Sequence, residues 1–274
     1  MNKMKYFTKK MITPLSTTAE LTGYVPDNSP EIDLKRKRPA VIICPGGAYR
    51  MTSDREAEAV AFKFLGMDLA AFVLRYSCAP ARYPVALLEL AESVRYVRAH
   101  AKEFALDPNK IIILGMSAGG HLAASLGTLW TDELFNDHGY AKEMIKPNGM
   151  ILCYPVITAG EFSHSGSFDN LVGKDPKLRE FLSLEKRVTA ATPPTFIWHT
   201  VADQSVPVEN SLLFAQALRK HGIDFEMHLY PYGRHGLSLG TKQTAKKANY
   251  IEPAVQSWIS LVETWLVGGN FQPK

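Results

Sequence analysis

The chain has 274 residues, 46% of them hydrophobic and 21% charged, and 31 Lys and Arg against 27 Asp and Glu give a formal net charge of +4. This balance excludes an intrinsically disordered or fibrous chain. The apolar runs, such as 111–116, are far shorter than the roughly 18 residues that a membrane-spanning helix needs. The densest basic run, 35–38, has no wide basic stripe or interleaved aromatic residues around it. We therefore expect neither a membrane nor a nucleic acid as partner.

The cysteine pattern and the N-terminus bear on location. Cys44, Cys78 and Cys153 lie in or next to apolar segments, with no C-x-x-C spacing and no metal-ligand spacing, so we expect reduced, buried thiols and no metal site. The basic segment 1–10 is followed by an apolar stretch too short and interrupted for a signal peptide. These features predict a cytoplasmic protein.

In chain order, unbroken apolar runs alternate with helical patterns. The segment 6–33 predicts antiparallel edge strands, and the later runs predict strands buried on both faces of a sheet. These runs are 39–45, 70–76, 110–116, 150–157 and 195–202. A last strand pattern spans 224–232. Helices are predicted at 57–65, 84–104, 121–130, 209–221 and 251–265.

Two further sequence features refine this pattern. Ser53 and Glu56 match a capping box ahead of the first helix. The Gly- and Pro-rich interval of about 158–194 carries interspersed apolar residues and predicts a small cap insertion. Strand and helix alternation predicts an α/β fold with a mainly parallel sheet covered by helices on both faces. We expect one domain over 1–274. The apolar last helix could serve the core or an interface, so a homo-oligomer stays open.

The candidate nucleophile is Ser117. The pentapeptide 115–119, G-M-S-A-G, follows a predicted buried strand and precedes a helix, the context of a nucleophile elbow. Small residues two before and two after the serine let strand and helix approach closely. An ordinary glycine-rich turn of a nucleotide-binding fold is the alternative, but neither G-x-G-x-x-G nor a P-loop pattern is present.

A serine hydroxyl needs a general base and a group that orients the base. Asp203 follows a predicted strand at its carboxyl end, where sites of open α/β sheets form; a turn or helix-cap aspartate is the alternative. His235 follows the last predicted strand, and the chain order Ser117, Asp203, His235 is the one that accompanies this elbow. The amides of Ala118 and of Gly47, in the loop 45–49, are the candidate oxyanion donors.

The sequence gives weaker support for substrate contacts than for the catalytic residues. Tyr49, which follows the glycine pair of the oxyanion loop, and Arg82 could contact sugar hydroxyls. A surface role for each is equally compatible with the sequence. His164 lies in the predicted cap and could line a pocket.

Four motifs in matching order carry a family resemblance. The chain from about Leu21 onward resembles bacterial α/β-hydrolase esterases of the acetyl-xylan esterase-like, carbohydrate-esterase-like branch. The motifs are C-P-G-G-A-Y at 44–49, G-M-S-A-G-G-H-L-A at 115–123, H-T-V-A-D-Q-S-V-P-V-E-N-S at 199–211 and G-R-H-G-L at 233–237. The resemblance assigns Ser117 as nucleophile, Asp203 as acid, His235 as base, and Gly47 with Ala118 as oxyanion donors.

Two positions depart from the pattern. Cys44 and Pro45 stand where the hormone-sensitive-lipase branch has H-G, and Ala202 stands where a second Asp often precedes the acid. The resemblance implies an α/β-hydrolase fold and cytoplasmic deacetylation of acetyl-decorated sugars.

The expected function is a serine carboxylesterase that hydrolyses short acyl esters through an acyl-enzyme on Ser117, with acetylated xylo-oligosaccharides or related sugars as substrates and no cofactor. Two alternatives remain. A prolyl-oligopeptidase-like serine peptidase shares the fold and triad but usually carries an additional large domain, and only about 35 residues precede the first central strand. A non-catalytic binding protein is disfavoured by the intact triad.

Overall fold

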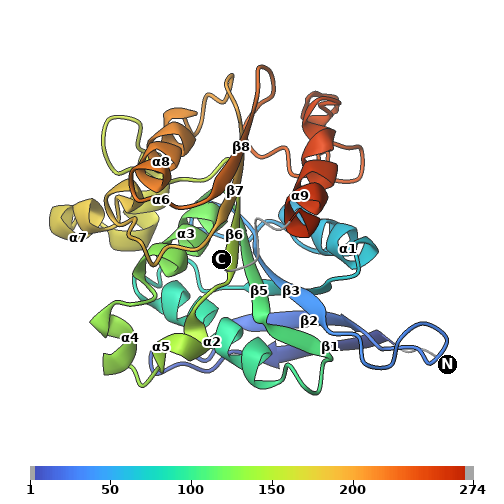
Figure 1. Ribbon diagram of the computed structural model, residues 1–274. Helices are drawn as coiled ribbons and strands as arrows, with labels where there is room; N and C mark the ends of the chain where they lie inside the picture. Colours follow the sequence, from blue (N-terminus) through green and yellow to red (C-terminus); the bar gives the residue numbers. More distant parts are fainter. Residues whose placement is uncertain (1–3, 269–274) are drawn as a thin grey trace.

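A single eight-stranded sheet runs through the protein in the computed structural model, which describes residues 4–268 (Figure 1). The outermost residues of the predicted domain 1–274 lie outside that range. The strand order is β1-β2-β4-β3-β5-β6-β7-β8. The strands are β1 (Met4–Lys10), β2 (Glu20–Pro26), β3 (Arg38–Cys44), β4 (Ala70–Arg75), β5 (Leu106–Met116), β6 (Gly149–Cys153), β7 (Thr195–Thr200) and β8 (Phe225–Tyr230). The pairs from β4 through β3 to β8 are parallel, and β1 and β2 add an antiparallel edge. The predicted mainly parallel sheet and antiparallel edge are therefore confirmed.

Helices cover both faces of this sheet (Figure 1). The α-helices are α1 (Glu58–Gly66), α2 (Val85–Ala99), α3 (Ala118–Leu129), α4 (Glu133–Asp137), α5 (Lys142–Ile145), α6 (Ser165–Val172), α7 (Pro176–Phe181), α8 (Glu209–Lys220) and α9 (Trp258–Val267). Buried side chains of α2, α3 and α8 pack into one core cluster, and those of α1 and α9 pack into the other.

The unbroken apolar sequence of the strands follows from these two cores. Successive side chains of a strand point to opposite faces of the sheet. In β3, Ala40 and Ile42 belong to the core cluster of α2, α3 and α8, whereas Val41 and Ile43 belong to that of α1 and α9. A polar residue at any of these positions would be buried, so apolar and polar residues do not alternate along the strand.

The start of α1 corrects one prediction. A short 3-10 turn, Asp54–Glu56, precedes the helix, and the Ser53 side chain makes no capping hydrogen bond. Glu56 is 3% exposed and bonds to a different part of the chain. The capping-box interpretation is therefore wrong, because the buried Glu56 carboxylate bonds to another part of the chain and not to the start of the helix.

The last helix also differs from its prediction. The α-helix begins at Trp258, after the 3-10 turns Ala248–Tyr250 and Val255–Ser257, instead of at residue 251. Pro253 lies between these turns, where its ring and missing amide hydrogen oppose helix continuation. Trp258 and Trp265 are fully buried in the core cluster of α1 and α9, so these two side chains serve the core.

The interval 158–194 lies between β6 and β7 and contains α6, α7 and the 3-10 turn Leu184–Lys186 (Figure 1). The Asn170 side-chain amide donates to the Ala48 carbonyl over 2.8 Å, and the Tyr83 amide donates to the Leu171 carbonyl over 2.9 Å. Helix α6 is thereby tied to the loops after β3 and before α2. Among the described residues, no helix is both long and apolar enough to cross a bilayer.

Candidate active site

Ser117 occupies a strained turn between β5 and α3. Its backbone has φ 55° and ψ −119°, a conformation that residues other than glycine rarely adopt. Two backbone bonds hold it there: the Ser117 amide donates to the Cys153 carbonyl over 3.0 Å, and the Val156 amide donates to the Ser117 carbonyl over 3.0 Å. The neighbouring strand and its following loop therefore maintain the conformation that projects the hydroxyl.

Flanking glycines make this turn possible. A Cβ on Gly115 would lie 2.1 Å from the Gly119 carbonyl oxygen, and a Cβ on Gly119 would lie 2.0 Å from the Cys44 carbonyl oxygen. Both contacts are with backbone atoms, which cannot rotate away. The predicted need for small residues at these two positions thus has a direct structural basis.

The structure brings Ser117, His235 and Asp203 into one hydrogen-bonded chain. His235 Nε2 lies 2.7 Å from the Ser117 Oγ, and His235 Nδ1 lies 2.6 Å from an Asp203 carboxylate oxygen. The carboxylate only accepts, so the neutral ring carries its proton on Nδ1 and accepts from the serine through Nε2. This protonation state is the one in which a histidine can take the serine proton.

Asp203 is buried yet stays ionised. Burial acts to raise the pKa of its carboxyl group, but hydrogen bonds from His199 and His235, the charge of His235 and the Val206 amide outweigh burial and lower the pKa well below its ordinary value. The amides of Ser205 and Val206 donate to Oδ1 over 2.9 and 3.0 Å, which leaves Oδ2 for His235. The carboxylate therefore keeps one orientation.

His199 is a neighbour of the site that sequence analysis treated only as part of a strand. It is fully buried, and its Nε2 lies 3.0 Å from the Val206 carbonyl and 3.4 Å from the Asp203 Oδ2. Because the carbonyl can only accept, Nε2 carries the proton, and Nδ1 accepts from the Ser211 hydroxyl over 2.7 Å. His199 thus approaches the same Asp203 oxygen that His235 contacts.

The loop after β3 packs directly against the nucleophile. A Cβ on Gly46 would lie 2.9 Å from the Ser117 Cβ, and the Gly47 backbone adopts φ 139°, which favours glycine. Ala118 is the first residue of α3, so its amide has no acceptor within the helix. These positions put the amides of Gly47 and Ala118 on the two segments adjacent to the Ser117 hydroxyl.

A buried carboxylate, missed by sequence analysis, braces this loop. Glu56 accepts from the Gly46 amide over 2.7 Å and from the Tyr154 hydroxyl over 2.9 Å. The Tyr154 oxygen in turn accepts from the Ser238 amide over 3.0 Å, and the Tyr154 ring packs edge-on against His235 at 5.2 Å between centroids. One chain of hydrogen bonds therefore links the loop of Gly47 to the loop of His235.

A cleft of about 430 Å³ opens onto Ser117 and His235. Gly47 and Ala48 line it from the loop after β3, and His164 lines it from the segment before α6. Its size lies in the range of small-ligand sites. Among residues 4–268, no group of three or more His, Cys, Asp or Glu side chains is arranged to hold a metal ion.

Comparison with known proteins agrees with this geometry. Residues 29–218 match the model of the BD-FAE family, which is well over half of the chain. The chain belongs to the BD-FAE family of α/β-hydrolase esterases. The family resemblance and the α/β-hydrolase fold predicted from the motifs are thereby confirmed.

Two curated relatives of this BD-FAE chain carry xylan-related names. It is 39% identical over 213 residues to endo-1,4-beta-xylanase B of Butyrivibrio fibrisolvens, covering 76% of this chain and 34% of the relative. It is 33% identical over 210 residues to an acetylxylan esterase of Xylanibacter ruminicola, covering 74% of this chain and 42% of the relative. The chain thus spans well under half the length of these curated relatives.

Solved structures match over nearly the whole BD-FAE chain. An acetyl ester-xyloside bifunctional hydrolase from Caldicellulosiruptor lactoaceticus is 39% identical with a TM-score of 0.82, covering 95% of this chain and 92% of that one. The carboxylesterase Cest-2923 from Lactobacillus plantarum is 27% identical with a TM-score of 0.83, covering 100% and 99%. The fold of the chain is therefore shared with these two hydrolases.

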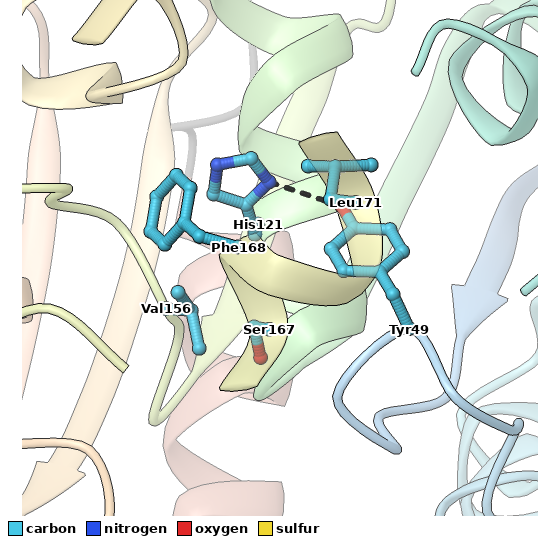
Figure 2. Close-up of a pocket in the computed structure, with 6 residues that line it drawn as sticks. All are labelled: Tyr49, His121, Val156, Ser167, Phe168 and Leu171. Carbon is cyan, nitrogen blue, oxygen red and sulfur yellow. Dashed lines mark hydrogen bonds between the residues drawn. The ribbon is translucent and has the colours of Figure 1, made fainter. Parts of the chain in front are cut away.

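The predicted substrate contacts of this BD-FAE protein lie in different places. Tyr49 is 3% exposed, and its hydroxyl lies 3.0 Å from His121 Nδ1 in a small pocket lined by Val156 and by residues of α6 (Figure 2). His121 Nε2 donates to the Leu182 carbonyl, so Nδ1 accepts from the tyrosine. Tyr49 therefore joins the loop after β3 to α3 and is absent from the residues that line the cleft.

Arg82 and His164 behave differently from each other. The Arg82 guanidinium is exposed and donates to the carbonyls of Asp169 and Asn170 at the end of α6, so it also lies apart from the residues lining the cleft. His164 does line the cleft, and its Nδ1 accepts from the Ser167 amide and hydroxyl. Burial, with the charge of His235 adding to the effect, lowers the pKa of His164. A neutral ring with Nε2–H as donor results.

Proposed function

We propose that the protein is a serine carboxylesterase that removes short acyl groups, with acetylated xylo-oligosaccharides or related acetylated sugars as substrates. The observation that carries the proposal is the continuous chain from Ser117 through His235 to Asp203, with distances of 2.7 and 2.6 Å. The printed names of two relatives, an acetylxylan esterase and an acetyl ester-xyloside bifunctional hydrolase, support acetyl esters of xylosides as the substrate class.

The proposed reaction begins at Ser117. Its Oγ attacks the ester carbonyl carbon while His235 Nε2 takes the hydroxyl proton, and the amides of Gly47 and Ala118 donate to the carbonyl oxygen as it becomes negative. His235 then gives the proton to the departing alcohol oxygen, which leaves an acyl group on Ser117.

The second half regenerates the enzyme. A water molecule attacks the acyl carbon while His235 takes one of its protons, and the acid leaves as the proton returns to the Ser117 Oγ. Asp203 holds the imidazole in the required tautomer throughout and stabilises its charged form. No step uses a metal or a cofactor.

His164 is proposed as a substrate contact. Its Nδ1 is occupied by Ser167, so its Nε2–H is the donor left to meet a substrate oxygen in the cleft. The cytoplasmic location stays a prediction.

The test is a substrate panel run on the whole chain. It contains p-nitrophenyl esters of two to eight carbons, acetylated xylo-oligosaccharides and a proline-containing peptide. We expect the highest kcat/KM on acetyl esters and release of acetate from the oligosaccharides. Cleavage of the peptide without ester turnover would establish the peptidase alternative, and inactivity on every substrate would favour the binding-protein alternative.

A further inference from the structure

Positively charged side chains cluster at the cleft that holds Ser117. Four residues that line it are Arg50, Arg55, Arg234 and Lys246. Glu56 is the carboxylate among the lining residues, and both of its oxygens already accept hydrogen bonds from the protein. The lining charge is therefore strongly positive, although the whole chain carries only +4.

Two of these cations share one aromatic ring. The Cζ of Arg55 lies 4.4 Å and the Cζ of Arg234 lies 4.3 Å from the centroid of the Tyr250 ring. Arg55 is fixed in place by donating to the carbonyls of Thr244 and Gly236. Two positive charges on the same ring repel each other, and an anion beside them would relieve that repulsion.

The protein supplies no such anion within residues 4–268. There, the side chains of Arg50, Arg234 and Lys246 take part in no ion pair. Some arginines elsewhere do find carboxylate partners, such as Arg75 with Asp54 and Glu58. Others, such as Arg82, bond only to carbonyl groups. What distinguishes the cleft is that its unpaired cations lie together on the lining that also holds Ser117 and His235.

The position of Arg234 relates this charge to the reaction. It directly precedes His235, whose Nε2 lies 2.7 Å from the Ser117 Oγ. Because Arg234 and Ser117 line the same cleft, one molecule can place an anionic group at Arg234 and its ester at Ser117. Guanidinium groups suit this task because their planar donors match the oxygens of carboxylate and phosphate groups.

We propose that the preferred substrates are esters whose alcohol part carries an anionic group, a carboxylate or a phosphate, bound by Arg234, Lys246 and Arg50 beside Tyr250. This proposal rests on the proposed function in one respect, that Ser117 cleaves an ester in this cleft. Positive charge at a cleft concentrates anionic ligands and speeds their association, and salt weakens the effect.

The test compares three substrates that differ at one carbon. They are the monoacetyl esters of methyl glucoside, methyl glucuronoside and methyl glucoside 6-phosphate. In that order, they carry a hydroxymethyl group, a carboxylate and a phosphate. The measured quantity is the ratio of kcat/KM for each anionic ester to that for the neutral ester. We expect a ratio of about ten or more, because electrostatic steering at a charged cleft raises association rates by about that factor or more. The larger of the two anionic ratios identifies the group that the cleft prefers.

Salt and substitutions then locate the source of the preference. Raising NaCl from about 0.1 M to about 1 M shortens the Debye length from about 10 Å to about 3 Å and should lower the ratio. The double variant Arg234→Gln/Lys246→Gln should bring the ratio toward one. Lys220→Gln, which removes an exposed charge at the end of α8, is the matched control and should keep the wild-type ratio. A wild-type ratio at or below one, or a ratio that the double variant does not lower, would overturn the proposal.

The same measurement distinguishes failure of the proposed function. If none of the three sugar esters reacts while p-nitrophenyl acetate does, sugars are the wrong alcohols. The ratio is then measured with 4-acetoxybenzoate against 4-acetoxybenzamide, which again differ in one negative charge. A ratio above one that the double variant lowers would support the anionic preference, and a ratio of one would overturn it.

Discussion

The Tyr154 hydroxyl donates a hydrogen bond to Glu56 over 2.9 Å, and this single bond connects the two loops on which the proposed reaction depends. On one side, Glu56 accepts from the Gly46 amide, next to the oxyanion candidate Gly47. On the other side, the Tyr154 oxygen accepts from Ser238, three residues after His235. Both side chains are buried, so loss of either partner leaves polar groups without water.

Tyr154→Phe should lower kcat about tenfold or more and change KM less, because it releases the oxyanion loop from the histidine loop. It leaves the Ser238 amide without an acceptor, at a cost of about 1–3 kcal/mol in the free energy of unfolding. The measurement is kcat and KM on p-nitrophenyl acetate, with urea unfolding alongside.

Tyr230→Phe is the matched control for this change. It also removes a tyrosine hydroxyl that bonds a serine, here Ser257 over 3.0 Å, and this bond connects neither loop to the other. Equal effects of the two substitutions on kcat would contradict a positioning role for Tyr154.

Asp203→Asn should reduce kcat by about 10³ to 10⁴ while leaving the fold intact. The Asn oxygen can still accept from Ser205 and Val206, but its NH₂ group then faces His235 and forces the proton onto Nε2. That tautomer cannot accept the Ser117 proton. Asp169→Asn, at an exposed position of α6, is the control for removal of a charge. Turnover by Asp203→Asn within tenfold of wild type would exclude Asp203 as the orienting acid.

His121 makes the stability of the protein depend on pH. Burial lowers the pKa of its ring from 6.5 to about 4 in the folded state, against a smaller raising effect of the Leu182 carbonyl. Between these two values the unfolded chain binds more protons, so stability falls as the pH falls from 6.5 toward 4. The full loss from this group is about 3 kcal/mol.

Urea unfolding of wild type and His121→Asn at pH 7 and pH 4.5 measures this effect. Asn cannot be protonated in that range, so the variant should lose less free energy of unfolding between the two pH values than wild type does. Equal losses in the two proteins would show that His121 does not carry this dependence.

Gly119→Ala should prevent folding or cost several kcal/mol, because its Cβ would lie 2.0 Å from the Cys44 carbonyl oxygen. Gly66→Ala is the control: it lies in the last turn of α1, where a new Cβ meets nothing within 4 Å. Melting temperatures of the two variants, with soluble yield, are the readout. A Gly119→Ala protein as stable as Gly66→Ala would refute the close approach of α3 to the loop after β3.

The sheet and its helices could be predicted from the sequence because their signals are local. A strand buried on both faces needs an unbroken apolar run, and such runs placed the five strands β3 to β7 to within a few residues. The nucleophile turn was equally predictable, since Gly115 and Gly119 are required by contacts with backbone atoms. The strand ends then brought the candidates Asp203 and His235 to the same edge as Ser117.

Contacts across the fold were not predictable in the same way. Glu56 matched a capping box, and only its burial against Gly46 and Tyr154 shows a different partner. Tyr49 was expected at the substrate because it follows the glycine pair, but its hydroxyl meets His121 in the core (Figure 2). Arg234 lies in the G-R-H-G-L motif, yet its pairing with the Tyr250 ring joins segments with no sequence signal between them.

The central claim is that Ser117 carries the acyl group, and trapping that intermediate tests it most directly. Wild-type protein is mixed with p-nitrophenyl acetate, quenched in acid within milliseconds and analysed by mass spectrometry of its peptides, beside Ser117→Ala. We predict one added acetyl group on the peptide that contains Ser117 in wild type, no such group in the variant, and loss of turnover in the variant. An acetyl group on another residue during turnover, or wild-type turnover by Ser117→Ala, would contradict the account.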